Sequence, residues 1–209
     1  MLIGLSVEWT GGKPEGALMF PLLVAAFGIV ASIIGTFVVR TKKGSSNVHG
    51  ALKNGLFLSS ALVLLFSFIF AKNLLPESVY MGVYLALVSG LVVGVIIGMI
   101  TEYYTSEHFS PVKKVAEASQ TGSATNIISG LALGYTSVFL PVVFICIAIA
   151  VAYMQAGLYG ISISAVGMLS TLGISLAIDA YGPVADNAGG LAEMAGLPSQ
   201  VRARTDALD

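Results

Sequence analysis

The sequence predicts an all-α membrane protein, a polytopic bundle of about five full transmembrane spans followed by the start of a sixth helix. Three observations predict this class: 56% of the 209 residues are hydrophobic, only 10% are charged, and 24 are glycine. A soluble domain carries about 25% charged residues and about 7% glycine. The composition therefore excludes a protein whose surface is mostly exposed to water.

The spans are the long stretches without charge, because a bilayer core needs about 20 apolar residues per helix. Residues 118–178 hold no charge over 61 residues, which suits two helices, and the glycines and glutamine of 155–160 suit the turn between them. A shorter uncharged stretch is flanked by Lys53 and Lys72, which can extend to the two interfaces. The predicted spans, all within a single membrane domain over 1–209, are 18–40, 52–72, 79–101, 127–153 and 158–182.

The distribution of lysine and arginine predicts the orientation, since short cytoplasmic loops carry the excess of positive charge. One side holds only Lys13 and Lys72. The other side, which we therefore assign to the cytoplasm, holds eight basic residues: Arg40, Lys42, Lys43, Lys53, Lys113, Lys114, Arg202 and Arg204.

Glycines at a spacing of four predict how the spans pack. Gly90, Gly94 and Gly98 recur in one span, and Gly130 with Gly134 repeats the spacing in another. Such faces let a second helix backbone approach closely, so we expect a tight bundle.

The end of the sequence predicts one more helix, which starts at about residue 198. Gly196 and Pro198 are typical of a helix boundary, and no glycine or proline interrupts 199–209. A helix without a stop signal at the last residue predicts that the chain is a piece of a longer membrane protein.

Four aspartates are the candidate functional residues, because a carboxylate beside a membrane span is costly and usually has a function. Asp179 and Asp186 are seven residues apart and share a helix face if the helix continues through Pro183. Asp206 and Asp209 are three residues apart and share a face as well. Hard cations prefer several oxygen ligands, so the pattern indicates a metal site.

Each aspartate also has a structural interpretation. Asp206 and Asp209 are equally compatible with surface residues that pair with Arg202 or Arg204. Asp179 is equally compatible with a hydrogen bond to a neighbouring helix, and Asp186 with a turn formed by the following asparagine and glycines.

Other functions are disfavoured. A net charge of −1 without a basic block argues against binding to nucleic acid. The single cysteine excludes a disulfide framework.

Several segments together resemble the membrane-integral pyrophosphatases, which couple hydrolysis of inorganic pyrophosphate to pumping of protons or sodium ions. The segments are DAYGPVADNAGGLAEM at 179–194, RTDALD at 204–209, TEYYT at 101–105, TGSATNII at 121–128 and ASIIGT at 31–36. They follow one another in the order and spacing of the family, from about Pro21 to the last residue.

The resemblance implies roles for individual residues. Asp186 and Asp209 match family aspartates that bind the magnesium complex of pyrophosphate at the cytoplasmic helix ends. Asp179 and Asp206 lie in the family motifs with a weaker case for direct metal contact. Asn187 and Glu193 are weaker candidates still, for which a structural role is equally compatible with the pattern.

The resemblance also implies what this chain does not contain. The aspartate-rich helices that precede this region in the family, and the later helices that complete the substrate site, have no counterpart here. We therefore expect a middle portion of a homodimeric, Mg²⁺-dependent and in some members K⁺-dependent enzyme, inactive alone. The rival interpretation is a small secondary transporter, or a noncatalytic membrane scaffold, in which the aspartates bind a cation.

Overall fold

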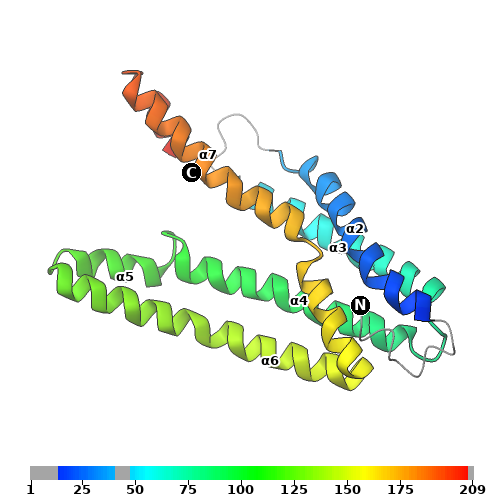
Figure 1. Ribbon diagram of the computed structural model, residues 1–209. Helices are drawn as coiled ribbons and strands as arrows, with labels where there is room; N and C mark the ends of the chain where they lie inside the picture. Colours follow the sequence, from blue (N-terminus) through cyan, green and yellow to red (C-terminus); the bar gives the residue numbers. More distant parts are fainter. Residues whose placement is uncertain (1–13, 41–47, 207–209) are drawn as a thin grey trace. The chain divides into compact units, whose positions relative to one another are not determined.

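The computed structural model describes residues 14–40 and 48–206 of the chain (Figure 1). Every regular element in this part of the chain is a helix, which confirms the all-α prediction. The helices are α2 (Pro14–Thr36), α3 (Val48–Leu74), α4 (Tyr80–Thr105), α5 (Ser110–Ser119), α6 (Ser123–Leu169), α7 (Leu172–Met194) and α8 (Ser199–Asp206).

Four helical stretches are long and apolar enough to cross a membrane, namely Pro14–Thr36, Gly50–Leu74, Tyr80–Ser119 and Ser123–Met194. The last is 72 residues long and includes both spans that the sequence predicts at 127–153 and 158–182. The outer surface is rich in large apolar side chains; on α6, for example, Tyr135 is 80% exposed and Phe139 67% exposed. Apolar residues over such an area belong in lipid or in a protein interface, and an integral membrane protein accounts for them.

The described residues form two compact units, each built from two separate parts of the chain. The first unit comprises 14–18 and 75–169, and the second comprises 19–74 and 170–206. The single membrane domain over 1–209 that the sequence predicts stays a prediction.

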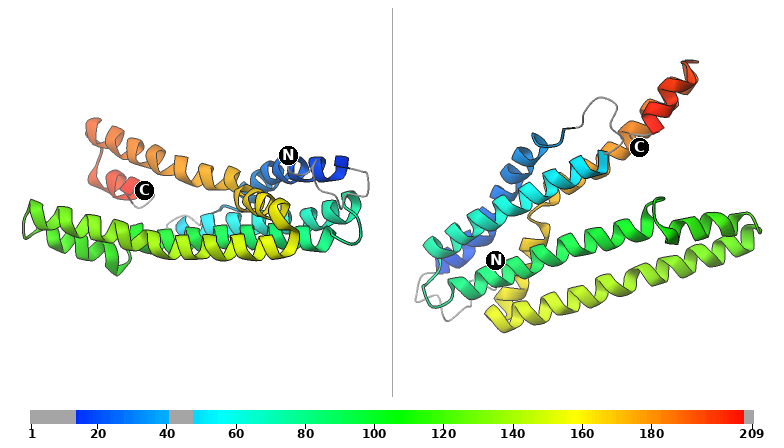
Figure 2. Two further views of the ribbon diagram at one scale, coloured as in Figure 1. Left: turned by 60° about the horizontal axis from the view of Figure 1, so that its bottom comes forward. Right: turned by 180° about the vertical axis from the view of Figure 1, so that it is seen from behind.

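In the first unit, α4 and α5 lie beside α6 in both views of Figure 2. Residues 102–126, which the sequence places between two spans, contain the ten-residue helix α5. Phe109 precedes this helix in an extended conformation, and Pro111 lies in its first turn, where a missing N–H costs nothing. α5 thus lies beside the beginning of α6, and the chain reverses between the two helices, where Gly122 has a φ of 137° (Figure 2).

A sharp turn divides α6 within the stretch 155–160. The backbone leaves the helical region at Ala156 (φ −150°, ψ 26°) and Gly157 (φ 59°, ψ −146°). A positive φ is available to glycine without a steric penalty, so Gly157 permits the reversal. The remaining helical residues, 158–169, pack against α4.

Glycines form this contact between α4 and the second part of α6. A Cβ atom added at Gly90 would overlap the carbonyl oxygen of Ser164, and one added at Gly167 would overlap the carbonyl oxygen of Leu87. The predicted close approach is therefore present at Gly90, and also at Gly94, where an added Cβ atom would lie 3.1 Å from Cγ of Met168. Among the described residues, nothing lies within 4 Å of a Cβ added at the other predicted positions, Gly98, Gly130 and Gly134.

The first unit also joins two distant parts of the chain through one hydrogen bond. The Tyr159 hydroxyl donates to the carbonyl oxygen of Ala17 over 2.7 Å, and the Tyr159 side chain is only 3% exposed. An apolar environment leaves that carbonyl without a substitute donor if the hydroxyl is removed.

Tyr159→Phe is therefore expected to destabilise the protein by about 1 kcal/mol, which corresponds to a fall of about 2–4 °C in the midpoint of thermal unfolding. The measurement is thermal unfolding of the purified protein in detergent. Tyr153→Phe is the matched control, because Tyr153 is 57% exposed. Equal midpoints for the two variants would contradict the proposed contribution of the hydrogen bond.

In the second unit, α2 packs against α3 through aromatic rings and a buried hydroxyl. The ring centroids of Phe27 and Phe66 are 3.9 Å apart. The Ser59 hydroxyl is fully buried and lies 3.0 Å from the carbonyl oxygen of Ala31 on α2 and 3.0 Å from that of Gly55 on its own helix.

The helix that the sequence predicts over 158–182 is divided at Ser170 and Thr171. α6 ends at Leu169 and α7 begins at Leu172. Both residues of the break are buried, and a Cβ atom added at Gly28 of α2 would overlap the carbonyl oxygen of Ser170. Serine and threonine hydroxyls compete with helical hydrogen bonds, and the contact with Gly28 holds the backbone at this point.

Candidate functional site

Helix α7 carries three of the candidate residues in one uninterrupted helix. It runs from Leu172 to Met194 with Pro183 inside it, which is the condition for Asp179 and Asp186 to share a face. Both aspartates are exposed, and so is Asn187. Asp186 and Asn187 therefore lie in helix, and not in the turn that was the structural alternative for this stretch.

The Asn187 side chain forms a hydrogen bond within α7. The Asn187 side-chain nitrogen donates to the carbonyl oxygen of Pro183 over 2.7 Å. This bond occupies the amide nitrogen and leaves the amide oxygen of Asn187 directed elsewhere. An amide oxygen is a ligand that magnesium and calcium accept, so the residue retains one suitable donor atom.

The two aspartates of α7 share a face but are far apart along it. Seven residues at 1.5 Å each separate them by about 10 Å along the axis. Magnesium holds its oxygen ligands at about 2.1 Å, so one ion cannot bind both carboxylates. A single magnesium ion therefore cannot have both Asp179 and Asp186 as ligands.

The end of α7 positions α8. Gly196 has a φ of 66°, and the N–H groups of Gly196 and Leu197 donate to the carbonyl oxygens of Glu193 and Ala192. This is a Schellman motif, which stops the helix at a glycine in the left-handed conformation. Pro198 follows, and α8 begins at Ser199, close to the position that the sequence predicts.

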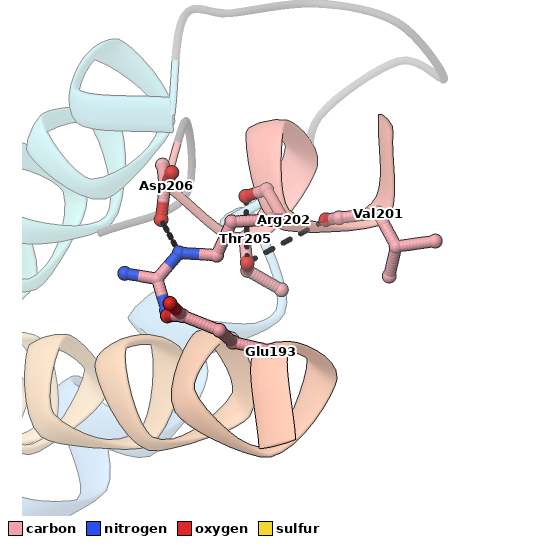
Figure 3. Close-up of polar contacts among 5 residues, drawn as sticks. All are labelled: Glu193, Val201, Arg202, Thr205 and Asp206. Carbon is pink, nitrogen blue, oxygen red and sulfur yellow. Dashed lines mark hydrogen bonds and ion pairs between the residues drawn. The ribbon is translucent and has the colours of Figure 1, made fainter. Parts of the chain in front are cut away.

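Helix α8 then packs against the last turns of α7. A Cβ atom added at Gly189 would lie 3.1 Å from the Thr205 hydroxyl and 3.2 Å from Nη1 of Arg202. Thr205 in turn donates to the carbonyl oxygen of Arg202 over 2.8 Å (Figure 3). The absence of a side chain at Gly189 therefore lets the two helices approach.

Arg202 links the two helices electrostatically. Its Nη1 lies 3.1 Å from Oε2 of Glu193 on α7, and its Nε lies 2.7 Å from Oδ1 of Asp206 on α8 (Figure 3). The side chains are between 37% and 74% exposed, so each pair contributes at most about 1 kcal/mol. Their effect is mainly to orient the guanidinium and the Asp206 carboxylate.

Among the candidates, Asp206 is thus paired with Arg202. This is the structural interpretation of Asp206, which the sequence left open beside a role in metal binding. Asp209 lies outside the described residues. In the described part of the chain, no three histidine, cysteine, aspartate or glutamate side chains lie close enough together to hold a metal ion. The oxygen chemistry of the exposed aspartates fits magnesium, but further ligands have to come from elsewhere.

Sequence reasoning missed the contact between Arg202 and Glu193 and the part played by Gly189. A signal was present in the spacing: Asp186, Gly189 and Glu193 are at positions i, i+3 and i+7 and share one face of α7. Two of them contact α8. Asp186 lies on the same face, one helical turn before that contact.

Comparison with known proteins adds an independent finding. The model of the family described as inorganic H+ pyrophosphatase matches residues 1–209. The chain is 49% identical, over 92% of its length, to a Bacteroides thetaiotaomicron protein named "Putative K(+)-stimulated pyrophosphate-energized sodium pump". It is 44% identical, over 100% of its length, to the K(+)-insensitive pyrophosphate-energized proton pump 2 of Moorella thermoacetica.

These relatives are longer. The chain covers 28% of the Bacteroides protein and 32% of the Moorella protein. It also covers 29% of the K(+)-insensitive pyrophosphate-energized proton pump of Caldanaerobacter subterraneus subsp. tengcongensis, at 43% identity. Because the family model matches the chain from its first residue to its last, and relatives at this level of identity agree, the chain belongs to the inorganic H+ pyrophosphatase family.

Proposed function

We propose that this chain forms part of a membrane-bound pyrophosphatase that couples hydrolysis of inorganic pyrophosphate to the pumping of protons or sodium ions. The observation that carries the proposal is the family match over 1–209 together with the exposed Asp186 one turn before the contact of α7 with α8. The relatives' names describe pyrophosphate-energized pumps of both ion specificities.

In this proposal Asp186 and Asp209 bind the magnesium complex of pyrophosphate, with Asp179, Asp206 and Asn187 as weaker candidates. Magnesium ions, when bound, neutralise the charge of the phosphate oxygens and lower the pKa of the attacking water. Asp186 supplies an acceptor oxygen from a rigid helix. Arg202 pairs with Glu193 of α7 and Asp206 of α8 and so helps to hold α8 against α7.

The site faces the cytoplasm in this proposal. The excess of lysine and arginine lies at the loops on the side where α7 ends, and short loops with such an excess are cytoplasmic. The complete protein works as a homodimer within the lipid bilayer, as the family resemblance implies.

The rival interpretation, a small secondary transporter, predicts carboxylates at a helix break near the middle of the membrane. The chain does have a break at Ser170 and Thr171. On α7, however, the nearest carboxylate after it is Asp179, eight residues and about 12 Å further along the helix axis. The break therefore does not favour a transporter over a pyrophosphatase.

Release of phosphate from pyrophosphate tests the proposal. Membranes that contain the longest continuous reading frame around this chain should release phosphate in the presence of Mg²⁺, whereas membranes with residues 1–209 alone should not. Assays with and without K⁺ and Na⁺ assign the ion dependence. Absence of hydrolysis in both preparations, with both proteins inserted, would overturn the proposal and favour the transporter or the scaffold.

A further inference from the structure

A cavity in the first unit is not explained by pyrophosphate hydrolysis. It has a volume of about 370 Å³ and lies between the end of α4, the first turns of α5 and the beginning of α6. This volume is within the range of about 300–1,000 Å³ that small-molecule sites occupy. Its lining includes Tyr103, Tyr104, Lys114, Ser129, Ala132 and Leu133.

The polar part of the lining suits an anion. Lys114 brings a positive charge, and hydroxyl groups from Tyr103, Tyr104 and Ser129 are available as donors. Among the described residues, the Lys114 side chain forms no ion pair or hydrogen bond, so its ammonium group is available to a ligand.

Aromatic contacts hold one wall of the cavity in place. The Tyr103 ring contacts the Tyr104 ring edge to face at a centroid distance of 5.1 Å, and it contacts the Phe109 ring at 5.2 Å. The wall therefore joins the last turn of α4 to the residue before α5. Such a wall keeps its shape better than separate flexible side chains would.

The remaining lining is apolar and continues onto an exposed apolar surface of α6. Ala132 and Leu133 line the cavity, and the neighbouring Leu131 and Tyr135 of α6 are 58% and 80% exposed. A soluble anion gains nothing from such surroundings. A ligand with a charged head and an apolar tail gains from both parts of the surface.

The position along the helices agrees with this chemistry. Tyr103 and Tyr104 are near the end of the apolar stretch of α4, where tyrosines commonly mark the boundary between membrane and water. Lys113 and Lys114 follow on α5, on the side where anionic lipids attract basic residues if it faces the cytoplasm.

We propose that this cavity binds the phosphate head group of an anionic phospholipid, with Lys114 as the charged contact and the surface around Leu133 in contact with an acyl chain. The proposal requires the membrane location of the chain but not pyrophosphate hydrolysis. A lipid bound here would bridge α4, α5 and α6.

Native mass spectrometry of the complete protein in detergent tests the proposal, with phosphatidylglycerol and phosphatidylcholine as the added lipids. Phosphatidylglycerol should bind in preference, and Lys114→Gln should weaken its binding about fivefold. Lys113→Gln is the matched control, because Lys113 is the adjacent lysine and does not line the cavity. Its effect should stay below about twofold.

A second pair of variants tests the cavity without changing charge. Ala132→Phe should fill the cavity and weaken phosphatidylglycerol binding, whereas Ile128→Phe, on an exposed part of α6 outside the cavity, should not. Equal losses for the two lysine variants, no loss in Lys114→Gln and Ala132→Phe, or full displacement of the lipid by millimolar inorganic phosphate would each overturn the proposal.

Discussion

Asp186→Asn in the complete protein is expected to lower the rate of Mg²⁺-dependent pyrophosphate hydrolysis by at least about 100-fold. The substitution keeps the size of the side chain but removes a negative charge, so the remaining amide oxygen is a weaker ligand for a divalent cation. Asp186 is exposed on α7, and the helix around it stays intact. The measurement is phosphate release as a function of Mg²⁺ concentration, in membranes with matched amounts of inserted protein.

The Mg²⁺ titration shows whether Asp186 is a metal ligand or a residue without contact to the metal. If Asp186 binds the metal, the variant should need more Mg²⁺ and regain part of its rate when Mg²⁺ is raised. Asp206→Asn serves as the comparison and should have a milder effect, because the Asp206 carboxylate already pairs with Arg202. Wild-type turnover in Asp186→Asn would remove this residue from the site while leaving the proposed pyrophosphatase activity intact.

Gly90→Val is expected to prevent the first unit from packing, with a cost of at least about 3 kcal/mol. Even the Cβ atom alone would overlap the carbonyl oxygen of Ser164, so the backbones of α4 and α6 have to separate. Helix association in a membrane depends on such close approach, since burial of apolar surface supplies little driving force between spans. The measurement is the yield of monodisperse protein in detergent and its thermal unfolding midpoint.

Two further variants identify the cause. Gly98→Val on the same helix should leave yield and midpoint nearly unchanged, because nothing among the described residues lies within 4 Å of that position. Adding Ser164→Gly to Gly90→Val should not restore folding, because the obstructing atom belongs to the backbone. Rescue by that double variant, or normal folding of Gly90→Val, would show that the contact is not as close as described.

The glycines also show how far the sequence could predict packing. Gly90, Gly94, Gly98 and Gly130 have the same spacing pattern, yet within the described residues an added Cβ atom would meet α6 at Gly90 and Gly94 and nothing within 4 Å at Gly98 and Gly130. The spacing depends on local geometry alone, whereas the partner of Gly90 lies on a segment that returns only after the turn at Gly157. The spacing therefore predicts a smooth helix face but not which part of that face contacts another helix.

The helix boundaries were also predicted where they depend on local sequence and missed where they depend on contacts with distant residues. Pro198 and Ser199 predict the start of α8 because capping and proline geometry are local. The break at Ser170 and Thr171 was not predicted, since both residues are compatible with a helix and the constraint comes from contact with Gly28 of α2. Likewise, the pairing of Asp206 with an arginine four residues earlier could be foreseen from the spacing. The contact of Arg202 with Glu193 could not, because it depends on how α8 folds back onto α7.

Helices that pack together in the first unit are far apart in the sequence, and this has a consequence for how the protein is made and inserted. Ser89 and Ser164, which face each other beside the Gly90 contact, are separated by 75 residues in the sequence. At about 5–20 residues per second, the ribosome needs about 4–15 s to make the second after the first. During this interval α4 is already synthesised while its partner is still absent, so lipid or the insertion machinery has to cover its glycine face. Slower translation between residues 90 and 164 prolongs that exposure.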